Sequence, residues 1–285
     1  MSKAAKQAIQ TELLMGMLDV PIGSQAVNEI VEDVHDEIQS VVSKPIDVVL
    51  NVTQPAMLTT STRSFTPLVG ESSNQVSLPP ADGSMTEQAR RLLELKERHD
   101  SECEYCTAVR GRIQTVFGEG NPDADIFFVG EAPGETEDRM GRPFVGLAGQ
   151  KLDEMIRAIG LRREDCYIAN IIKSRPPENR TPLPAEIERC GPYLVDQILI
   201  VNPKVIVTLG GPATKLLLKV DTGISKLRGV WAEWIPPSAS GRGPIALMPT
   251  YHPNYLLRNY TTETRMEVWS DLKAVVRRIT ESPTV

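Results

Sequence analysis

The sequence predicts an α/β domain over residues 86–285, with a three-layer α/β/α architecture around a mainly parallel, four-stranded sheet. The main observation is that β-rich runs at 124–130, 165–172, 204–210 and 244–250 alternate with helix-like stretches. Strands that alternate with crossover helices form parallel sheets covered on both faces. In such sheets ligands bind outside the carboxyl ends of the strands, so the residues that follow each run are the candidates for a site.

The helix-like stretches complete the pattern. One is expected before the first strand, three between strands and one at the end of the chain; these lie near 86–98, 147–159, 184–201, 211–219 and 263–280.

Residues 1–85 are expected to form a separate acidic extension with one or two helices and a linker. They hold 4 Lys and Arg against 10 Asp and Glu, so the net charge of −6 lies there, while 27 basic and 27 acidic residues balance in the remainder. Apolar residues three and four apart in 25–42 predict an acidic helix with a narrow apolar seam. We expect a protein partner to dock through residues 1–45, and the Ser/Thr/Pro-rich stretch 44–83 to be a linker without assigned structure.

The remaining bulk properties indicate a cytoplasmic protein without a membrane segment. The sequence has no signal-peptide-like start and no apolar run of 18 residues. Its four cysteines are therefore expected to be thiols or metal ligands rather than disulfides. Because residues 86–285 are neutral as a whole, any contact with nucleic acid must come from a local patch.

Glycine-rich loops follow the first expected strand. Segment 130–134 reads Gly-Glu-Ala-Pro-Gly, and segment 141–149 reads GRPFVGLAG with Phe144 inside it. Glycines let backbone amides approach a ligand closely, and the helix expected from Leu147 presents its amino end there. The alternative is a Gly/Pro turn with solvated acids. An aromatic side chain in such a loop suits the flat wall of a base-binding pocket.

Polar residues follow two further strands. Asn170 ends the second strand, and its amide donates and accepts in one plane, which matches an imide N–H beside a carbonyl; the alternative is an Asn that caps a turn. His252 follows the fourth strand and precedes a proline. A lone histidine is more often structural, but this position favours a hydrogen-bond donor to a developing anion.

Five motifs occur in one order: GEAPGETED, GRPFVGLAG, N-x4-RPPENR-x-P, E-x3-C and YHPNYLLR. Together they resemble the thermostable-type, family 4 uracil-DNA glycosylases, and the resemblance covers about residues 86–280. It implies hydrolysis of the N-glycosidic bond of uracil in DNA during base-excision repair, with the base rotated into a pocket. Uracil-containing DNA is then the partner of the domain.

The resemblance also implies roles for single residues. Phe144 would stack on uracil, Asn170 would pair with its imide edge and exclude cytosine, and His252 would hydrogen-bond the 2-carbonyl as negative charge builds on the base. Glu137 would close the pocket near C5, where thymine carries a methyl group. The further implied residues are Gly130 and Ala132 in the pocket, Glu131 (alternatively structural) and Asn179 near the attacking water, and Leu256, Leu257 and Arg258 as a wedge in the vacated stack.

A metal site is expected from Cys103-x2-Cys106 with Cys190. The alternatives for a CxxC alone are a redox pair or half of a zinc site. The resemblance implies a 4Fe–4S cluster held by four thiolates, but the third of these positions is Ser174. Cys166 stands eight residues earlier at a strand start, roughly 25 Å away along an extended chain, and is expected to be a buried strand residue. Three alternatives remain open: three thiolates with Ser174 as a weaker oxygen ligand, a three-iron cluster, or no cluster. We expect that a cluster binds but is more labile than one held by four thiolates.

Two other functions compete with an active glycosylase. A catalytically weak or silent uracil- or DNA-binding module, recruited through the acidic extension, fits the neutral charge and the serine at a cluster position. A nucleotide- or sugar-phosphate-binding enzyme would rest only on the glycine-rich turns.

Overall fold

The computed structural model describes residues 85–281. The predicted extension of residues 1–85, with its helices, its linker and its docking segment, lies outside the described residues except for Met85. Six strands form one sheet: β1 (Glu119–Gly120), β2 (Ile126–Gly130), β3 (Tyr167–Asn170), β4 (Val205–Leu209), β5 (Ala232–Trp234) and β6 (Ile245–Thr250). The α-helices are α3 (Glu87–Glu102), α4 (Glu104–Ala108), α5 (Glu135–Met140), α6 (Leu147–Ala158), α7 (Pro184–Val201), α8 (Gly211–Leu218), α9 (Ile224–Leu227), α10 (Pro253–Arg258) and α11 (Thr262–Glu281).

The sheet is mixed and mostly parallel, in the order β1-β3-β2-β4-β6-β5. Its four central strands are the four predicted ones, and they run parallel to one another. The expectation of four strands is corrected to six, because β1 and β5 add antiparallel edges. These edge strands are two and three residues long. Such short segments carry no alternating pattern, and only their pairing with β3 and β6 makes them strands.

The carboxyl ends of the central strands meet at one edge of the sheet. Gly130, at the end of β2, pairs in register with Asn170, at the end of β3. On the other side, Leu209 at the end of β4 pairs with Thr250 at the end of β6. The chain leaves β2 first towards β3 and later crosses to β4, so strand order reverses beside β2. That is where α/β sheets open a crevice for ligands.

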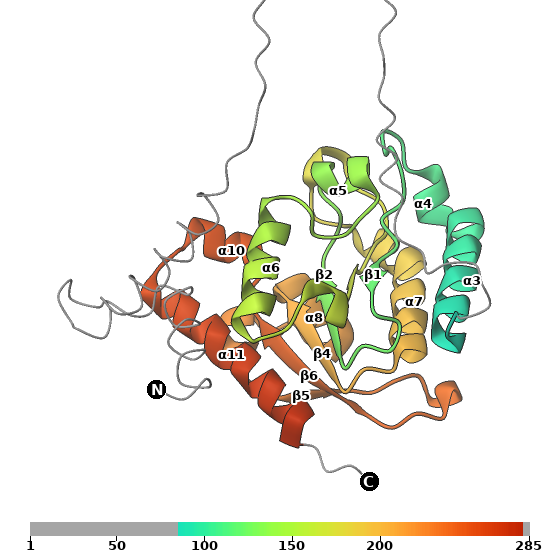
Figure 1. Cartoon of the computed structure of the whole chain (residues 1–285). Coiled ribbons are helices and arrows are strands. Elements are labelled where there is room, and N and C mark those ends of the chain that lie inside the picture. Colours follow the sequence, from blue (N-terminus) through green and yellow to red (C-terminus); the bar gives the residue numbers. More distant parts are fainter. Residues whose placement is uncertain (1–84, 282–285) are drawn as a thin grey trace, which may run out of the picture. The chain divides into compact units, whose positions relative to one another are not determined.

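Helices cover both faces of the sheet, as the three-layer prediction requires (Figure 1). Alternate residues of each strand point to opposite faces, so Phe127 and Val129 enter one core and Ile126 and Phe128 the other. The first core also takes apolar residues from α3, α4, α7 and α8, and the second from α6, α10 and α11. Within the described part of the chain, no helix is both long and apolar enough to cross a membrane.

Candidate functional site

A polar cavity of about 310 Å³ opens at the carboxyl ends of β2, β3 and β6. The residues that line it come from the end of β3, from the loops after β2, β3 and β6, and from the first turns of α5, α6 and α10. The predicted site residues among them are Glu131, Ala132, Glu137, Phe144, Asn170, Asn179 and His252. The fold therefore brings together residues that lie more than 120 positions apart in the chain.

Phe144 forms an aromatic wall of this cavity. It is 5% exposed, and its backbone has a φ of 50°, which side-chain-bearing residues adopt at a cost in free energy. Its ring centroid lies 5.7 Å from that of His252. Gly149 explains the close approach of α6, because a Cβ there would lie 1.9 Å from the Phe144 carbonyl oxygen. The loop that contains Phe144 thus fixes the position of its ring, although the Phe144 backbone is strained.

Glu137 joins the two glycine-rich loops. Its Oε1 accepts hydrogen bonds from the amides of Val145 (2.9 Å) and Gly146 (2.8 Å), and its Oε2 accepts one from Gly134 (3.1 Å). A carboxylate that accepts three backbone N–H groups is fixed in one orientation. The geometry gives Glu137 a clear positioning role in addition to its place in the cavity wall.

Asn170 presents an unpaired acceptor to the cavity. The residue is 1% exposed, and its Oδ1 is buried without a hydrogen-bond partner among the described residues. Its main-chain carbonyl accepts a hydrogen bond of 2.7 Å from the buried Lys173 ammonium, which fixes the end of β3. A buried amide oxygen without a partner costs free energy, and a ligand N–H would satisfy it.

His252 is the N-cap of α10, and this sets its tautomer. The Asn254 amide donates to His252 Nδ1 at 3.1 Å, so the proton of a neutral ring lies on Nε2. Burial, helped by the Arg258 charge and opposed by Glu137, lowers the pKa of His252 to about 4. The imidazole is therefore neutral near pH 7 and keeps one N–H to donate.

The two residues expected near the attacking water also line the cavity. Burial raises the pKa of Glu131, against a hydrogen bond with Thr181 that lowers it. Asn179 has a φ of 56°, and its Oδ1 accepts from Arg175 Nε at 2.7 Å. Because that bond engages Oδ1, a contact with a ligand would come from the side-chain N–H groups of Asn179.

The three residues expected to form a wedge do not share one environment. Leu256 is 1% exposed and packs in the core under α10, whereas Leu257 is 41% exposed and Arg258 is also exposed. A side chain needs to be accessible in order to enter DNA, so only the last two have a suitable position.

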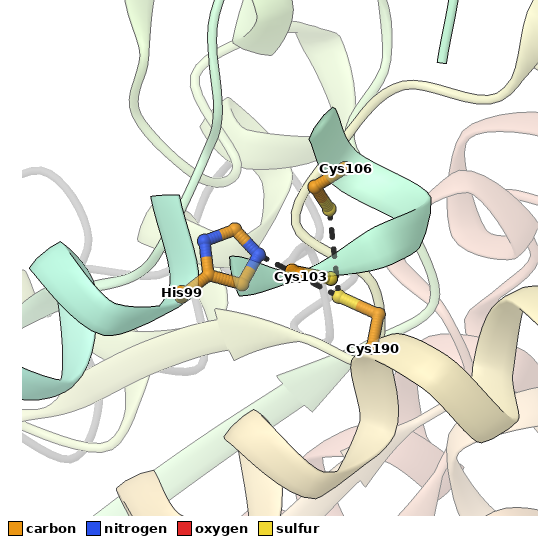
Figure 2. Close-up of side chains that lie close together, drawn as sticks. All are labelled: His99, Cys103, Cys106 and Cys190. Atoms are coloured by element: carbon orange, nitrogen blue, oxygen red, sulfur yellow. Dashed lines mark hydrogen bonds between the residues drawn. The ribbon is translucent and has the colours of Figure 1, made fainter. Parts of the chain in front are cut away.

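Apart from this cavity, four buried side chains converge between α3, α4 and α7. They are His99, Cys103, Cys106 and Cys190, and their ligand atoms all lie within 4.8 Å of one another. Figure 2 shows the three sulfurs and the imidazole pointing towards a common centre. This set, here called the metal-binding group, confirms the expectation that the three cysteines can hold a metal. None of its members lines the cavity.

Comparison with known proteins identifies the family. A family model described as the uracil DNA glycosylase superfamily matches residues 117–273. The type-4 uracil-DNA glycosylase of Thermotoga maritima is 47% identical over 185 residues, which cover 64% of this chain and 92% of that protein. The type-4 enzyme of Archaeoglobus fulgidus is 43% identical over 180 residues, covering 61% and 86%. The chain belongs to the type-4 uracil-DNA glycosylases.

A type-5 uracil-DNA glycosylase, from Pyrobaculum aerophilum, is more distant at 29% identity over 167 residues, 52% of this chain and 71% of that protein. The type-4 assignment agrees with the five motifs from which the family was expected. The metal-binding group departs from what this family resemblance implies, because it contains three thiolates and an imidazole in place of four thiolates.

Sequence reasoning missed His99 as a member of the metal-binding group. The residue is fully buried and lies four positions before Cys103, where two residues share one face of a helix. The four-residue spacing between His99 and Cys103 therefore indicates in the sequence that the two side chains can bind one ion. Ser174, in the position of the missing thiolate, is also fully buried, and its Oγ has no hydrogen-bond partner among the described residues. Cys166 is buried just before β3 and stays outside the group, as expected.

Proposed function

We propose that this chain hydrolyses the N-glycosidic bond of uracil in DNA, leaving an abasic site for base-excision repair. Family membership sets the reaction class. The observation that carries the proposal for this chain is the unpaired Oδ1 of Asn170, buried in a cavity that Phe144 and His252 also line. An acceptor, a flat apolar wall and a neutral N–H donor are the groups that a uracil ring requires.

Recognition of uracil follows from these three groups. Phe144 stacks on the ring, and Asn170 accepts from the imide N–H through Oδ1 and donates to the neighbouring carbonyl through its NH₂. Cytosine presents a ring acceptor and an exocyclic donor at these places, so both contacts would be mismatched. Glu137 closes the pocket near C5, and Gly130 and Ala132 leave room for the ring.

The chemistry is cleavage of the C1′–N1 bond. The electron pair passes to uracil N1, and the negative charge spreads to the 2-carbonyl oxygen, towards which His252 donates its Nε2–H. Water adds to C1′ and gives up a proton, for which Glu131 is the acceptor because its raised pKa makes it a better base than an exposed carboxylate. Asn179 donates to that water and helps to orient it.

The DNA duplex is opened by residues of α10. Leu257 and Arg258 are exposed at its end and fill the space that the rotated nucleotide leaves. The buried Leu256 supports them from the core rather than entering the stack. None of the residues of the metal-binding group lines the cavity, so a metal there would not touch the substrate in this cavity. A 4Fe–4S cluster, as the resemblance implies, would find three of its four thiolates there.

The test of function is release of uracil from an oligonucleotide that carries one deoxyuridine. Full-length protein in excess is incubated with single- and double-stranded substrate, and abasic sites are cleaved with alkali. We expect strand cleavage at the uracil and none at thymine or cytosine. Tight binding without any cleavage above the buffer control would instead support a DNA-binding module.

Asn170→Asp is expected to change base selection. An ionised carboxylate accepts but cannot donate, so it loses the contact to the uracil carbonyl and repels the developing anion. A bidentate amide–base contact is worth about 1–3 kcal/mol of discrimination, so the ratio of uracil to cytosine excision should fall by roughly 10- to 100-fold. Single-turnover rates on matched uracil and cytosine oligonucleotides measure this ratio, and an unchanged ratio would remove Asn170 from the pocket.

Gly130→Ala is expected to fill the base pocket. A Cβ at this position would lie 2.4 Å from Asn170 Oδ1 and 2.4 Å from Phe144 Cζ. Displacing well-packed side chains costs about 1–3 kcal/mol, so we expect kcat/KM for uracil release to drop by roughly 10- to 100-fold. Gly243→Ala is the matched control, since its Cβ would meet nothing within 4 Å. Equal activity of the two variants would contradict a uracil ring beside Gly130.

A further inference from the structure

We propose that His99, Cys103, Cys106 and Cys190 bind one tetrahedral Zn²⁺ ion, with His99 Nε2 as the fourth ligand, in place of the 4Fe–4S cluster that the family resemblance implies. The inference concerns the fold of this chain and stands apart from the proposed activity. It rests on the distances within the group, on the partners of His99 and on the nature of the donors.

The distances match a single ion. Zinc binds thiolate at about 2.3 Å and imidazole at about 2.0–2.1 Å, so a tetrahedral site separates two sulfurs by about 3.8 Å and a sulfur from a nitrogen by about 3.5 Å. Cys106 Sγ lies 3.6 Å from Cys190 Sγ, and Cys190 Sγ lies 3.8 Å from His99 Nε2. A 4Fe–4S cluster inserts four irons and four sulfides between its thiolates and needs a wider arrangement than atoms within 4.8 Å of one another.

The second nitrogen of His99 is held by a carboxylate. Nδ1 lies 2.8 Å from Asp100 Oδ1. Asp100 is itself fixed by Thr115 Oγ1, at 2.8 Å, and by the Lys96 ammonium, at 2.5 Å. Because an ionised carboxylate only accepts, Nδ1 carries the proton and the lone pair of Nε2 points to the sulfurs. A carboxylate behind a metal-binding imidazole is the usual arrangement that fixes the ring and raises its basicity.

Ser174 is a poorer fourth ligand than His99. Its hydroxyl is a hard oxygen donor beside three soft thiolates, whereas imidazole and thiolate are the donors of structural zinc sites. Ser174 still belongs to the surroundings of the group, because the amide of its neighbour Lys173 donates to Cys190 Sγ at 3.3 Å. A backbone N–H on a metal-bound sulfur is a second contact that stabilises the thiolate.

Burial and charge also favour a structural ion. Cys103 and Cys106 are 1% and 0% exposed, so they are inaccessible to the partner thiol that a redox CxxC pair must meet. Three thiolates, a neutral imidazole and Zn²⁺ leave one negative charge, which a positive charge on the buried Lys173, whose amide donates to Cys190 Sγ, would offset. The ion would tie α3 and α4 to α7, three helices that pack on one face of the sheet.

The first experiment measures metals in the full-length protein, purified in the absence of oxygen. Elemental analysis is expected to give about one zinc per chain and no stoichiometric iron, without absorbance near 400 nm. X-ray absorption at the zinc edge should show three sulfurs at about 2.3 Å and one nitrogen at about 2.0–2.1 Å. Three or four irons per chain with absorbance near 400 nm would overturn the proposal, and so would a protein that holds neither metal nor takes up added Zn²⁺.

Variants then identify the fourth ligand. We expect His99→Ala to weaken Zn²⁺ binding in a chelator competition by more than the 10- to 100-fold that loss of an outer-shell partner costs. His99→Cys, which supplies another zinc donor, should retain the ion. Ser174→Ala should keep it as well, as should Cys166→Ala, the matched control at a buried cysteine outside the group. Loss of zinc in Ser174→Ala with full retention in His99→Ala contradicts the assignment.

If His99→Ala does not fold, two other measurements still test whether His99 binds the ion. The zinc-edge spectrum of the unmodified protein reports directly whether nitrogen is a ligand. The spectrum of His99→Cys should change from three sulfurs and one nitrogen to four sulfurs, and an unchanged spectrum would show that position 99 does not bind the ion.

Discussion

Replacing His252 by alanine is expected to lower kcat for uracil release by about 100- to 1000-fold, the usual effect of removing one hydrogen-bond donor to a developing anion. The reason is the tautomer: the Asn254 amide occupies Nδ1, and the low pKa keeps the ring neutral, so Nε2–H is available for the 2-carbonyl. KM should change less than kcat, because the charge develops only in the transition state. Single-turnover kinetics on a uracil oligonucleotide measure the effect.

The control for this prediction is His252→Ser. Serine keeps a side-chain acceptor for the amino end of α10, as the N-cap position requires, but does not reach the base. It should therefore lose as much activity as alanine does. Recovery of activity in His252→Ser would show that the cap, and not the N–H donor, matters. The donor is neutral above about pH 4, so a step in kcat near pH 6.5 that His252→Ser removes would also contradict this role.

Replacing Asp271 by alanine is expected to destabilise the fold by about 3 kcal/mol. This carboxylate is 2% exposed on α11, and it accepts hydrogen bonds from the Arg228 guanidinium and from Thr250 Oγ1 at 2.7 Å. Removing it leaves a mostly buried cation with one fewer partner. The loss stays near the lower end of the range for buried pairs because Arg228 also donates to the Glu267 carbonyl at 2.7 Å.

Chemical and thermal unfolding measure the Asp271 effect, with a fall in Tm of roughly 6–12 °C for a domain of this size. Asp271→Asn should lose less, since its amide still accepts from Thr250. Asp125→Ala, at a half-exposed ion pair with Lys204, is the matched control and should stay within about 1 kcal/mol. If Asp125→Ala and Asp271→Ala lose the same stability, burial of the pair is not the cause. The Thr250 bond fixes the end of β6 two residues before His252, so activity should fall as well.

The sequence by itself determined the central sheet and the order of the site motifs. A strand that is buried on both faces, such as Ile126–Gly130, needs a short, continuous run of apolar residues, and such runs are visible in the sequence. Helices between successive strands indicate that the strands pair in parallel. Parallel strands end at one edge, so Asn170 at the end of β3 and His252 after β6 were expected near that edge. The spacing of Cys103 and Cys106, taken together with Cys190, likewise indicated a metal site without any knowledge of the fold.

Only the tertiary structure decided which side chains share an environment. The edge strands Glu119–Gly120 and Ala232–Trp234 exist through pairing with distant residues, and a two- or three-residue segment has too little pattern of its own. Leu256 and Leu257 are identical in type, yet the packing of α10 buries one and exposes the other. The place of His99 beside Cys190, 91 residues away, comes from the docking of α3 on α7. Contacts over such distances depend on how helices pack on the sheet, which local pattern does not encode.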